Sequence, residues 1–318
     1  MTLVPQTGEL LNGPECAGLV ARYFPALRIE RMRVNDSGWD SRVLEVNGEY
    51  VFRFPRWESS VRSLRREVRL LPELAPLLGI AVPQYEFISP GAANGASLEP
   101  AFAGYRMLGG SFLAPQLFRE RVHGAAFTHC ARQLGEFLGT LHSFPRERAE
   151  TLGIEVAPPE SFLPHLRELQ RKAAPLLTVP CRKRVEGLVE RAGALWQQCR
   201  YPLVLAHNDL VPEHILFDEA AGAISGIVDF GDVMIDDPAG DFTTIYCEYG
   251  WDFGEAVLAH YKPGLDSLAL ARCQVYRRLE PFYWVDYGLQ TGKQAYVKAG
   301  LTMLENDTHG LAAGSQMV

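Results

Sequence analysis

Three residues near the middle of the chain have types and spacing that suit chemistry on phosphate groups. Asp209 follows His207 and Asn208 in a polar loop. His214 comes a few residues later, and Asp229 stands at the end of the next apolar run. A carboxylate in a tight loop can accept the proton of an attacking hydroxyl, and a second carboxylate with an imidazole can hold a divalent cation on nucleotide phosphates. Because phosphoryl transfer depends mainly on positioning and charge neutralisation, we predict that Asp209 is the catalytic base and that His214 and Asp229 are metal ligands.

The elements that must position these residues are short apolar runs. Pro202–Ala206, His214–Phe217 and Ile224–Phe230 are each bounded by turn-forming residues, which is the pattern of buried strands. The acidic residues therefore lie at strand ends, in loops that a rigid scaffold carries. Imidazole is an unusual ligand for Mg²⁺, which prefers oxygen, so direct contact of His214 with the metal and contact through water both remain open.

The same stretch resembles the catalytic segment of the aminoglycoside phosphotransferases, antibiotic kinases with a protein-kinase-like fold. The pattern is carried by His207–Asp209, His214 and Asp229–Phe230–Gly231, and Asp241–Phe242 also matches. The segment is most similar to the 2''-phosphotransferase branch, which also has His at the second position. The macrolide phosphotransferases share the variant Pro212–Glu213–His214 and are the nearest alternative.

The resemblance implies a bilobal, protein-kinase-like fold of the α/β (α+β) class. Residues 1–107 are expected to form an N-lobe, with a nucleotide-binding sheet of five antiparallel strands plus a helix. Residues 108–318 are expected to form a larger helical C-lobe with the catalytic loop, the metal site and a helical substrate-binding subdomain. Asn47–Gly48 is a strong hairpin signal inside the predicted sheet.

Apolar periodicity gives the same order of elements. It predicts strands at Ile29–Val34, Arg42–Val46, Tyr50–Phe54, Val82–Ile88 and Phe102–Leu108, and helices at Glu9–Tyr23, Ser59–Leu71, Phe127–Ser143, Glu160–Ala174 and Cys181–Gln198.

The resemblance also assigns residues to the phosphates of the nucleotide. Arg53 stands on the third predicted strand, where the family usually has the Lys that holds the α- and β-phosphates, and Glu67 on the next helix is expected to pair with it. An Arg supplies the charge with a different reach. Ser37, in the preceding turn-rich loop, is a candidate donor to phosphate, and an ordinary hairpin tip is the alternative.

The nucleotide base is expected at the strand that leads out of the sheet. The resemblance implies that backbone groups of Arg106 and Leu108 bind the base and that Tyr105 is the gatekeeper behind it, although Tyr105 can also be read as a core aromatic residue. A bulky gatekeeper can favour guanine over adenine in this branch. ATP and GTP are therefore both open as phosphate donors, with Mg²⁺ as the cofactor.

Acidic and aromatic residues in the C-terminal third suit a cationic sugar. Carboxylates pair with ammonium groups, and aromatic rings pack on sugar faces. The alternative is a helix-bundle core with an acidic surface. The candidates are Asp232, Glu248, Trp251, Glu280 and Trp284.

These assignments together predict an enzyme that transfers the γ-phosphate of ATP or GTP to a hydroxyl of an aminoglycoside, at the 2'' position. One alternative is a kinase of a macrolide or of a metabolic small alcohol. A second is a catalytically weak nucleotide-binding protein, an interpretation that the unusual Arg53 and His214 motivate.

Composition narrows the class of partner. The chain of 318 residues has a net charge of −7 and a sequence pI near 5.7, which argues against binding to nucleic acid or to anionic membranes. The six cysteines are scattered, so a zinc site or a disulfide framework is not expected. The sequence shows neither a signal peptide nor a long apolar run. We therefore expect a cytoplasmic protein with a small-molecule partner, and the choice between monomer and dimer stays open.

Overall fold

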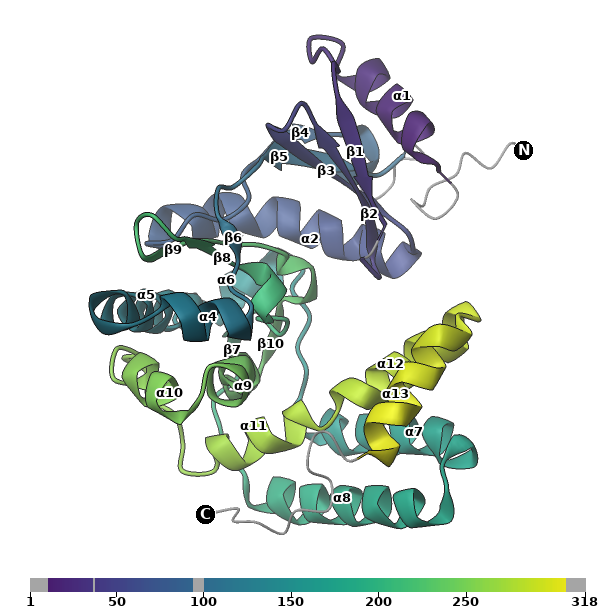
Figure 1. Ribbon diagram of the computed structural model, residues 1–318, viewed down its shortest axis with the longest axis vertical. Coiled ribbons are helices and arrows are strands. Elements are labelled where there is room, and N and C mark those ends of the chain that lie inside the picture. The colour runs from purple at the N-terminus through teal and green to yellow at the C-terminus, as the bar shows by residue number, and fades with distance from the viewer. Residues whose placement is uncertain (1–10, 37, 94–99, 307–318) are drawn as a thin grey trace.

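The structure is a computed structural model that describes residues 11–36, 38–93 and 100–306. An antiparallel sheet dominates the N-terminal part, and helices with two small sheets form the larger C-terminal part (Figure 1). The predicted α/β fold with an N-terminal sheet region and a helical C-terminal region is therefore confirmed. The predicted boundary between residues 107 and 108 falls between the fifth and sixth strands and stays a prediction.

The N-terminal sheet has five strands in the order β1-β2-β3-β5-β4, and each neighbouring pair is antiparallel. Its strands are β1 (Met32–Asn35), β2 (Ser41–Val46), β3 (Tyr50–Pro55), β4 (Tyr85–Ile88) and β5 (Ala103–Arg106). Asn47 and Gly48 connect β2 to β3 with φ angles of 59° and 74°. These left-handed values are ones that Asn and Gly tolerate, so the predicted Asn-Gly hairpin is confirmed.

Helices cover both faces of this sheet. On one face, α1 (Gly13–Tyr23) packs against an aromatic core in which the rings of Phe54 and Phe102 stack 4.8 Å apart. On the other, α2 (Glu58–Leu74) lies between the sheet and the C-terminal part (Figure 1). A short helix, α3 (Pro90–Ala93), follows β4.

Ten helices of the C-terminal part surround two small sheets within the described residues. The helices are α4 (Pro115–Arg121), α5 (Gly124–His142), α6 (Arg146–Thr151), α7 (Pro159–Ala173), α8 (Val179–Gln198), α9 (Ala239–Glu248), α10 (Trp251–Leu258), α11 (Ala269–Arg277), α12 (Glu280–Thr291) and α13 (Gln294–Glu305). One sheet has the order β6-β8-β9, from β6 (Ser111–Phe112), β8 (Ile215–Asp218) and β9 (Ala223–Ile227), and the other pairs β7 (Val204–Ala206) with β10 (Met234–Asp236).

A continuous apolar core joins the two parts. Leu70, Leu71 and Leu74 of α2 belong to the same buried cluster as Phe137 of α5 and Phe230. The shared core is strengthened by a backbone hydrogen bond of 2.9 Å from Ile227 to Ala81. The catalytic segment is therefore packed directly under the N-terminal part, and the polar residues between the parts are left around a cleft.

Several predicted strands are shorter in the structure than the apolar runs indicated, and two of them have a clear local cause. β4 begins at Tyr85 and not at Val82, because Pro83 has no N–H to give to a sheet. β9 ends at Ile227, and the chain leaves the sheet before Asp229, which has a φ of 62°. Among the described residues, no helix is long and apolar enough to cross a membrane.

Candidate functional site

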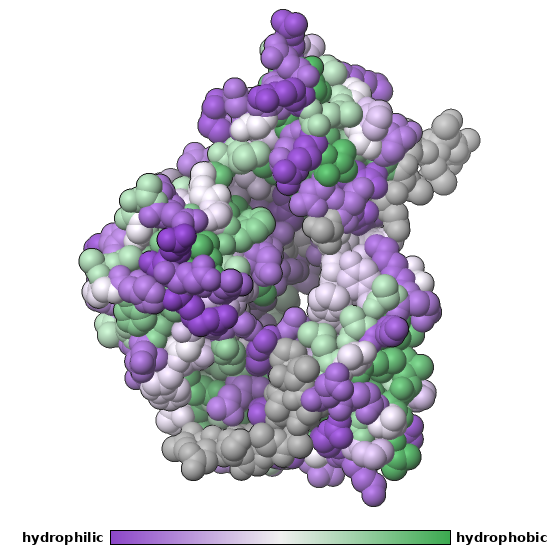
Figure 2. Space-filling model, in the orientation of Figure 1, coloured by the Kyte–Doolittle hydropathy of each residue, from purple (hydrophilic) through white to green (hydrophobic). Residues whose placement is uncertain are grey.

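A cleft of about 1400 Å³ lies between the N-terminal sheet and the C-terminal helices. Figure 2 shows the molecular surface hollowed between these two parts. Residues from both parts line it, including Arg53 and Tyr105 of the sheet and Asp209, His214 and Asp229 of the catalytic segment. The structure therefore brings together the residues that the sequence predicted as catalytic, phosphate-binding and metal-binding.

A buried carboxylate fixes the backbone of the catalytic loop. Asp241 is 1% exposed and accepts hydrogen bonds from the N–H groups of His207 (2.7 Å) and Asn208 (2.8 Å). His142 Nε2 lies 3.0 Å from the same carboxylate, and Tyr261 contacts the other side of the His142 ring at 2.8 Å. Burial alone would raise the pKa of Asp241, but the hydrogen bond and charge of His142 hold it below its ordinary value. The loop therefore depends on an ionised Asp241.

His207 is a structural residue of the same loop. It is fully buried, its Nδ1 accepts from the N–H of Asp209 at 3.3 Å, and its Nε2 lies 3.2 Å from the carbonyl oxygen of Val228. Both ring nitrogens therefore have partners that suit a neutral imidazole. Burial lowers the pKa of His207 to about 4.

This neutral histidine predicts a loss of stability in mild acid. The unfolded chain takes up a proton near pH 6.5, whereas folded His207 resists protonation until about pH 4. Its contribution is therefore complete above pH 6.5 and is lost between pH 6.5 and 4, with a total of roughly 3 kcal/mol. The free energy of unfolding, measured by denaturant titration at pH 7 and pH 5, should fall less steeply in His207→Asn than in the wild type. An unchanged slope in His207→Asn would contradict the assignment, and His123→Asn, at an exposed histidine, serves as the control.

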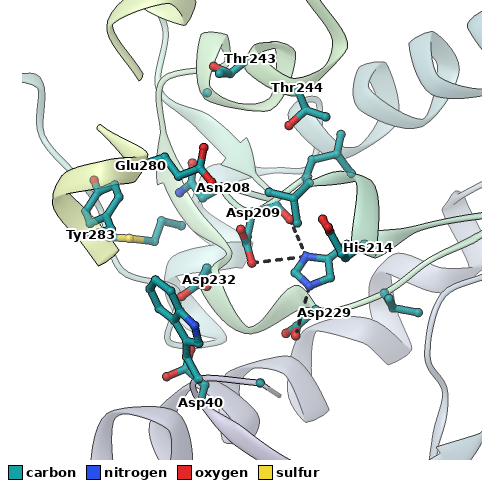
Figure 3. Close-up of a pocket in the computed structure, with 18 of the residues that line it drawn as sticks. Asp40, Asn208, Asp209, His214, Asp229, Asp232, Thr243, Thr244, Glu280 and Tyr283 are labelled. Carbon is teal, nitrogen blue, oxygen red and sulfur yellow. Dashed lines mark hydrogen bonds and ion pairs between the residues drawn. The ribbon is translucent and has the colours of Figure 1, made fainter. Parts of the chain in front are cut away.

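The imidazole of His214 lies between the two predicted catalytic carboxylates (Figure 3). Its Nδ1 is 2.7 Å from the carbonyl oxygen of Asp209 and 3.3 Å from Asp209 Oδ2, and its Nε2 is 3.6 Å from Asp229 Oδ2. Desolvation, with a smaller effect of Asp229, raises the pKa of Asp209 to about 6 against the opposing charge of His214. Desolvation lowers the pKa of His214, but Asp209 and Asp229 outweigh it and raise that pKa overall.

Arg53 links the sheet to the second of these carboxylates. Its guanidinium donates to Glu67 Oε2 at 2.8 Å and to Asp229 Oδ1 at 2.7 Å. Glu67 is 1% exposed, so the predicted Arg53–Glu67 pair is present and buried. Burial would raise the pKa of Asp229, but the charges of Arg53 and His214 lower it to about 2. Asp229 is therefore ionised over the whole physiological range.

The side chains near Asp229 and His214 show whether this part of the cleft could coordinate the expected magnesium ion. Across residues 11–36, 38–93 and 100–306, no group of three or more His, Cys, Asp or Glu side chains could hold a metal ion. Asp229 Oδ1 contacts Arg53, which leaves Asp229 Oδ2 and His214 Nε2 facing each other. A two-donor set fits Mg²⁺ that brings phosphate oxygens and water as its other ligands. The residues therefore fit a cation that is held jointly with a nucleotide.

Most of the residues predicted to bind the nucleotide lie in one region of the cleft, which we call the nucleotide end. Tyr105 and Leu108 line the cleft, and Tyr105 packs edge-on against Tyr85 with ring centroids 5.3 Å apart. The side chain of Arg106 turns away to Tyr50, at 3.0 Å, and the predicted role of its backbone stays a prediction. Ser37 lies outside the described residues.

Four of the five residues predicted to bind the acceptor line one region of the cleft, which we call the acceptor end. Asp232, Glu248, Glu280 and Trp284 line the cleft. Trp251 does not line the cleft, and its role as an acceptor residue stays a prediction. It is 60% exposed at the start of α10 and packs against Tyr246 with ring centroids 5.5 Å apart. Its acidic and aromatic sequence context matched that of the true lining residues, and only the path of the chain separates them.

Several lining residues escaped the sequence analysis. Arg277 forms ion pairs with Glu248, at 2.5 Å, and with Glu280. Asp40 of the N-terminal part lies close enough to Asp232 to raise its pKa, and desolvation with Asp209 and Asp40 brings the pKa of Asp232 to about 7. Asp236 and Tyr276 also line the cleft. Arg277 and Glu280 are three residues apart in the sequence, at the end of α11 and the start of α12, and this spacing was the available signal for their pair.

An aromatic contact closes one side of the cleft. The ring of Trp39, on the loop before β2, stacks on Tyr287 of α12 with centroids 4.4 Å apart, and meets Trp284 and Tyr296 edge-on at 5.7 Å each. The carbonyl of Trp39 accepts a hydrogen bond of 3.1 Å from Trp57. The loop is therefore fixed to the N-terminal part by its backbone and to the C-terminal helices by its ring.

Replacement of Trp39 by Ala is expected to lower the free energy of unfolding by about 2 kcal/mol, because aromatic pairs contribute about 0.5–1.5 kcal/mol each beyond the burial of their area. Trp39→Phe should recover most of this loss. Denaturant unfolding measures both values. Leu289→Ala, at an exposed position of α12, should change the free energy by less than about 0.5 kcal/mol. Equal stability of Trp39→Ala and the wild type would show that the ring contact contributes nothing in solution.

The fold and the site together define a kinase-like phosphotransferase, with a sheet above a polar cleft, a held carboxylate and a buried Arg–Glu pair. The sequence profile of the phosphotransferase enzyme family, which is the aminoglycoside phosphotransferase type, matches residues 31–282. The chain belongs to this family and is a small-molecule phosphotransferase, as the sequence predicted.

Individual relatives agree with this class. The GDP complex of wild-type aminoglycoside 2'-phosphotransferase-IIIa is 27% identical, covers 93% of this chain and 98% of its own, and superimposes with a TM-score of 0.83. The macrolide 2'-phosphotransferase of Brachybacterium faecium is 26% identical, with 90% and 96% coverage and a TM-score of 0.67. Viomycin phosphotransferase of Streptomyces vinaceus is 26% identical over 76% of this chain and 81% of its own.

Proposed function

We propose that this phosphotransferase moves the γ-phosphate of GTP or ATP to a hydroxyl of a cationic antibiotic, with an aminoglycoside, at the 2'' hydroxyl, as the first candidate acceptor. The observation that carries the proposal is the placement of Asp209 beside the His214–Asp229 pair, at the point where the nucleotide and acceptor ends of the cleft meet. Attack of a hydroxyl on a phosphate requires a base beside a phosphate-binding centre, and this arrangement supports the proposal.

Asp209 acts as the base in this proposal. With a pKa of about 6, it is largely ionised at neutral pH and still basic enough to accept the hydroxyl proton as the bond to phosphorus forms. Asp241 holds the loop backbone through two hydrogen bonds, so Asp209 does not need to be ordered when the substrates bind. Orientation of the hydroxyl is therefore built into the free enzyme.

The nucleotide is held by the N-terminal part in this proposal. Arg53, fixed by Glu67, binds phosphate oxygens, and the backbone at Arg106 and Leu108 binds the base in front of Tyr105. His214 and Asp229 would hold Mg²⁺, which neutralises phosphate charge when it is bound. GTP stands beside ATP because the 27% identical enzyme was solved with GDP and because Tyr105 is bulky. The residue 107/108 boundary then divides a nucleotide-binding lobe from an acceptor-binding lobe.

The acceptor is proposed to be an aminoglycoside on the basis of charge and similarity. Asp232 and Asp236 line the acceptor end close to the catalytic loop, where ammonium groups pair with carboxylates. An aminoglycoside 2''-phosphotransferase that is 27% identical, with a TM-score of 0.81, was solved with GDP and kanamycin. These similarities fit a cytoplasmic enzyme that uses cellular nucleotides and binds neither nucleic acid nor membranes.

A macrolide is the second candidate, and the aromatic lining favours it. Phe162, Tyr276, Tyr283 and Trp284 line the acceptor end and give it an apolar surface. Rings of this kind bury the hydrocarbon body of a ligand.

The test is nucleoside diphosphate release by the purified protein with Mg²⁺, with GTP and ATP run separately against kanamycin, a macrolide and no acceptor. Release that requires kanamycin and is lost in Asp209→Ala supports the aminoglycoside proposal and identifies the nucleotide. Release only with the macrolide transfers the proposal to the second candidate. Nucleotide binding without release for any acceptor contradicts the antibiotic-kinase proposal and favours a binding protein or a metabolic alcohol kinase.

A further inference from the structure

Arg277 occupies a position in the acceptor end that an acceptor cation would be expected to fill. It ends α11 and forms ion pairs with Glu248 at the end of α9, at 2.5 Å, and with Glu280 at the start of α12. All three residues line the cleft. The side chain of Arg277 is 32% exposed, so its guanidinium is partly withdrawn from water while it faces the cleft.

The carboxylates of the acceptor end therefore fall into two groups. Glu248 and Glu280 are neutralised in part by one guanidinium. In the part of the chain that the structure describes, neither Asp232 nor Asp236 forms an ion pair with Lys or Arg, although the charge of Arg53 acts on Asp232. Asp236 accepts hydrogen bonds from the amide of Asn208 and from the N–H of Asp237. Figure 3 shows Asp232 on the same side of the cleft as Asp209. The carboxyl groups without an ion-pair partner are thus the ones near Asp209.

We propose that Arg277 is a specificity-determining residue that limits the positive charge of the acceptor. This inference rests on the proposed function, because it concerns the acceptor end of the same cleft. One cationic group of the acceptor pairs with Asp232 and Asp236. A second cationic group that approached Glu248 and Glu280 would have to displace a tethered guanidinium and would be repelled by it. Hydroxyl and ether oxygens, which accept hydrogen bonds from guanidinium, suit this position.

The proposed function does not distinguish acceptors with several cationic groups from acceptors with one, whereas a repulsive Arg277 does. Polycations such as kanamycin are expected to bind less tightly than the number of acids in the cleft suggests. Acceptors with a single amine and a larger apolar body fit Asp232 together with the rings of Tyr283 and Trp284. Arg277 therefore acts against one class of acceptor through repulsion, which is a common source of specificity.

A structural role for Arg277 makes a different prediction. The ion pairs also tie α9 to the α11–α12 corner, and loss of such a tie would weaken the binding of every acceptor. Loss of a repulsive charge strengthens the binding of polycations selectively. The sign of the change for kanamycin therefore distinguishes the two roles.

The test measures binding by calorimetry with GTP and Mg²⁺ absent, so that turnover does not enter the result. The probes are kanamycin and a macrolide with one tertiary amine. Arg277→Gln is expected to bind kanamycin roughly five- to tenfold more tightly than the wild type, the scale on which removal of one partly exposed like charge acts. Its affinity for the macrolide should change by less than about twofold. Arg277→Lys keeps the charge and should behave as the wild type.

Two further variants complete the experiment. Glu248→Gln removes one carboxylate and keeps Arg277, so kanamycin should bind more weakly, and this variant tests the inference even if Arg277→Gln fails to fold. Arg278→Gln changes a neighbouring arginine that is not part of the cleft lining and should leave both affinities unchanged.

An unchanged or weaker affinity of folded Arg277→Gln for kanamycin would overturn the inference, as would kanamycin binding to neither protein. The proposed function fails separately, through the absence of acceptor-dependent nucleoside diphosphate release in the wild type. Arg277→Gln could bind kanamycin more tightly while the wild type releases no nucleoside diphosphate. Arg277 would then still limit the positive charge of the ligand, but the cleft would carry out a different reaction.

Discussion

Asp209→Asn is expected to lower the turnover number by about 10³-fold, while the affinity for nucleotide changes by less than about twofold. The amide has nearly the same shape as the carboxylate but cannot accept the hydroxyl proton, and general base catalysis contributes on the order of 10²–10⁴-fold. The backbone of Asp209 keeps its contacts with His207 and His214, so the loop should not move. Steady-state kinetics with the acceptor that the release assay identifies gives the turnover number, and calorimetry gives the nucleotide affinity.

The matched control is Asp252→Asn, at an exposed acid of α10. It makes the same chemical change away from the cleft and should keep the wild-type turnover. If Asp209→Asn retained more than about a tenth of the activity, the base would have to be another group. Asp232 would then be the first candidate, because its pKa of about 7 also suits proton transfer.

Asp241→Asn is expected to lower the free energy of unfolding by about 3–5 kcal/mol, the scale for breaking a buried charged network. Two backbone N–H groups and the His142 ring donate to both carboxylate oxygens. An amide has only one acceptor oxygen, so its NH₂ group must face a donor in a buried place, and at least one donor loses its partner. Denaturant unfolding at pH 7 measures the loss.

The same change should also reduce turnover, because His207 and Asn208 would no longer fix the loop that carries Asp209. The turnover of the folded variant can be compared with that of Asp252→Asn. A loss below about 1 kcal/mol with normal turnover would show that the loop holds its shape without Asp241. The loop geometry would then be determined by the local backbone conformation, and in particular by the left-handed φ of 63° at Asn208.

The catalytic segment could be predicted from the sequence because its chemistry is local. Asp209, His214 and Asp229 stand at the ends of short apolar runs, and strand ends project side chains into a common loop region. The pair of Arg53 and Glu67 was predicted from the resemblance, and in the structure Arg53 donates to Glu67 at 2.8 Å. Where pattern and resemblance agreed, the structure brings the residues together.

The acceptor end could not be predicted in the same way, because it depends on contacts between distant segments. Arg277 lies beside Glu248 only because α11 packs on α9. Trp39 reaches Tyr287 across the cleft from a position far away in the sequence, and no periodicity in either segment carries that information. The position of Trp251 outside the cleft lining could not be predicted for the same reason, since its exposure on α10 is decided by tertiary packing and not by its neighbours in the chain.

Arg53 also bears on the alternative of a catalytically weak nucleotide-binding protein. Its planar guanidinium reaches Glu67 and Asp229 at the same time, which an ammonium on one stem does less readily. Arg53 therefore connects the sheet to the carboxylate of Asp229. The departure from the usual Lys is compatible with an active site that is already assembled in the free protein.

The central claim is phosphoryl transfer to a small-molecule hydroxyl, and the most direct measurement follows the phosphate itself. The protein would be incubated with Mg²⁺, kanamycin or a macrolide, and GTP or ATP labelled at the γ-phosphorus, and the acceptor would then be isolated. We expect one labelled phosphoryl group on an acceptor hydroxyl, and a rate of labelling about 10³-fold lower with Asp209→Asn. Label that appears only as inorganic phosphate, at equal rates with and without acceptor, would contradict the central claim.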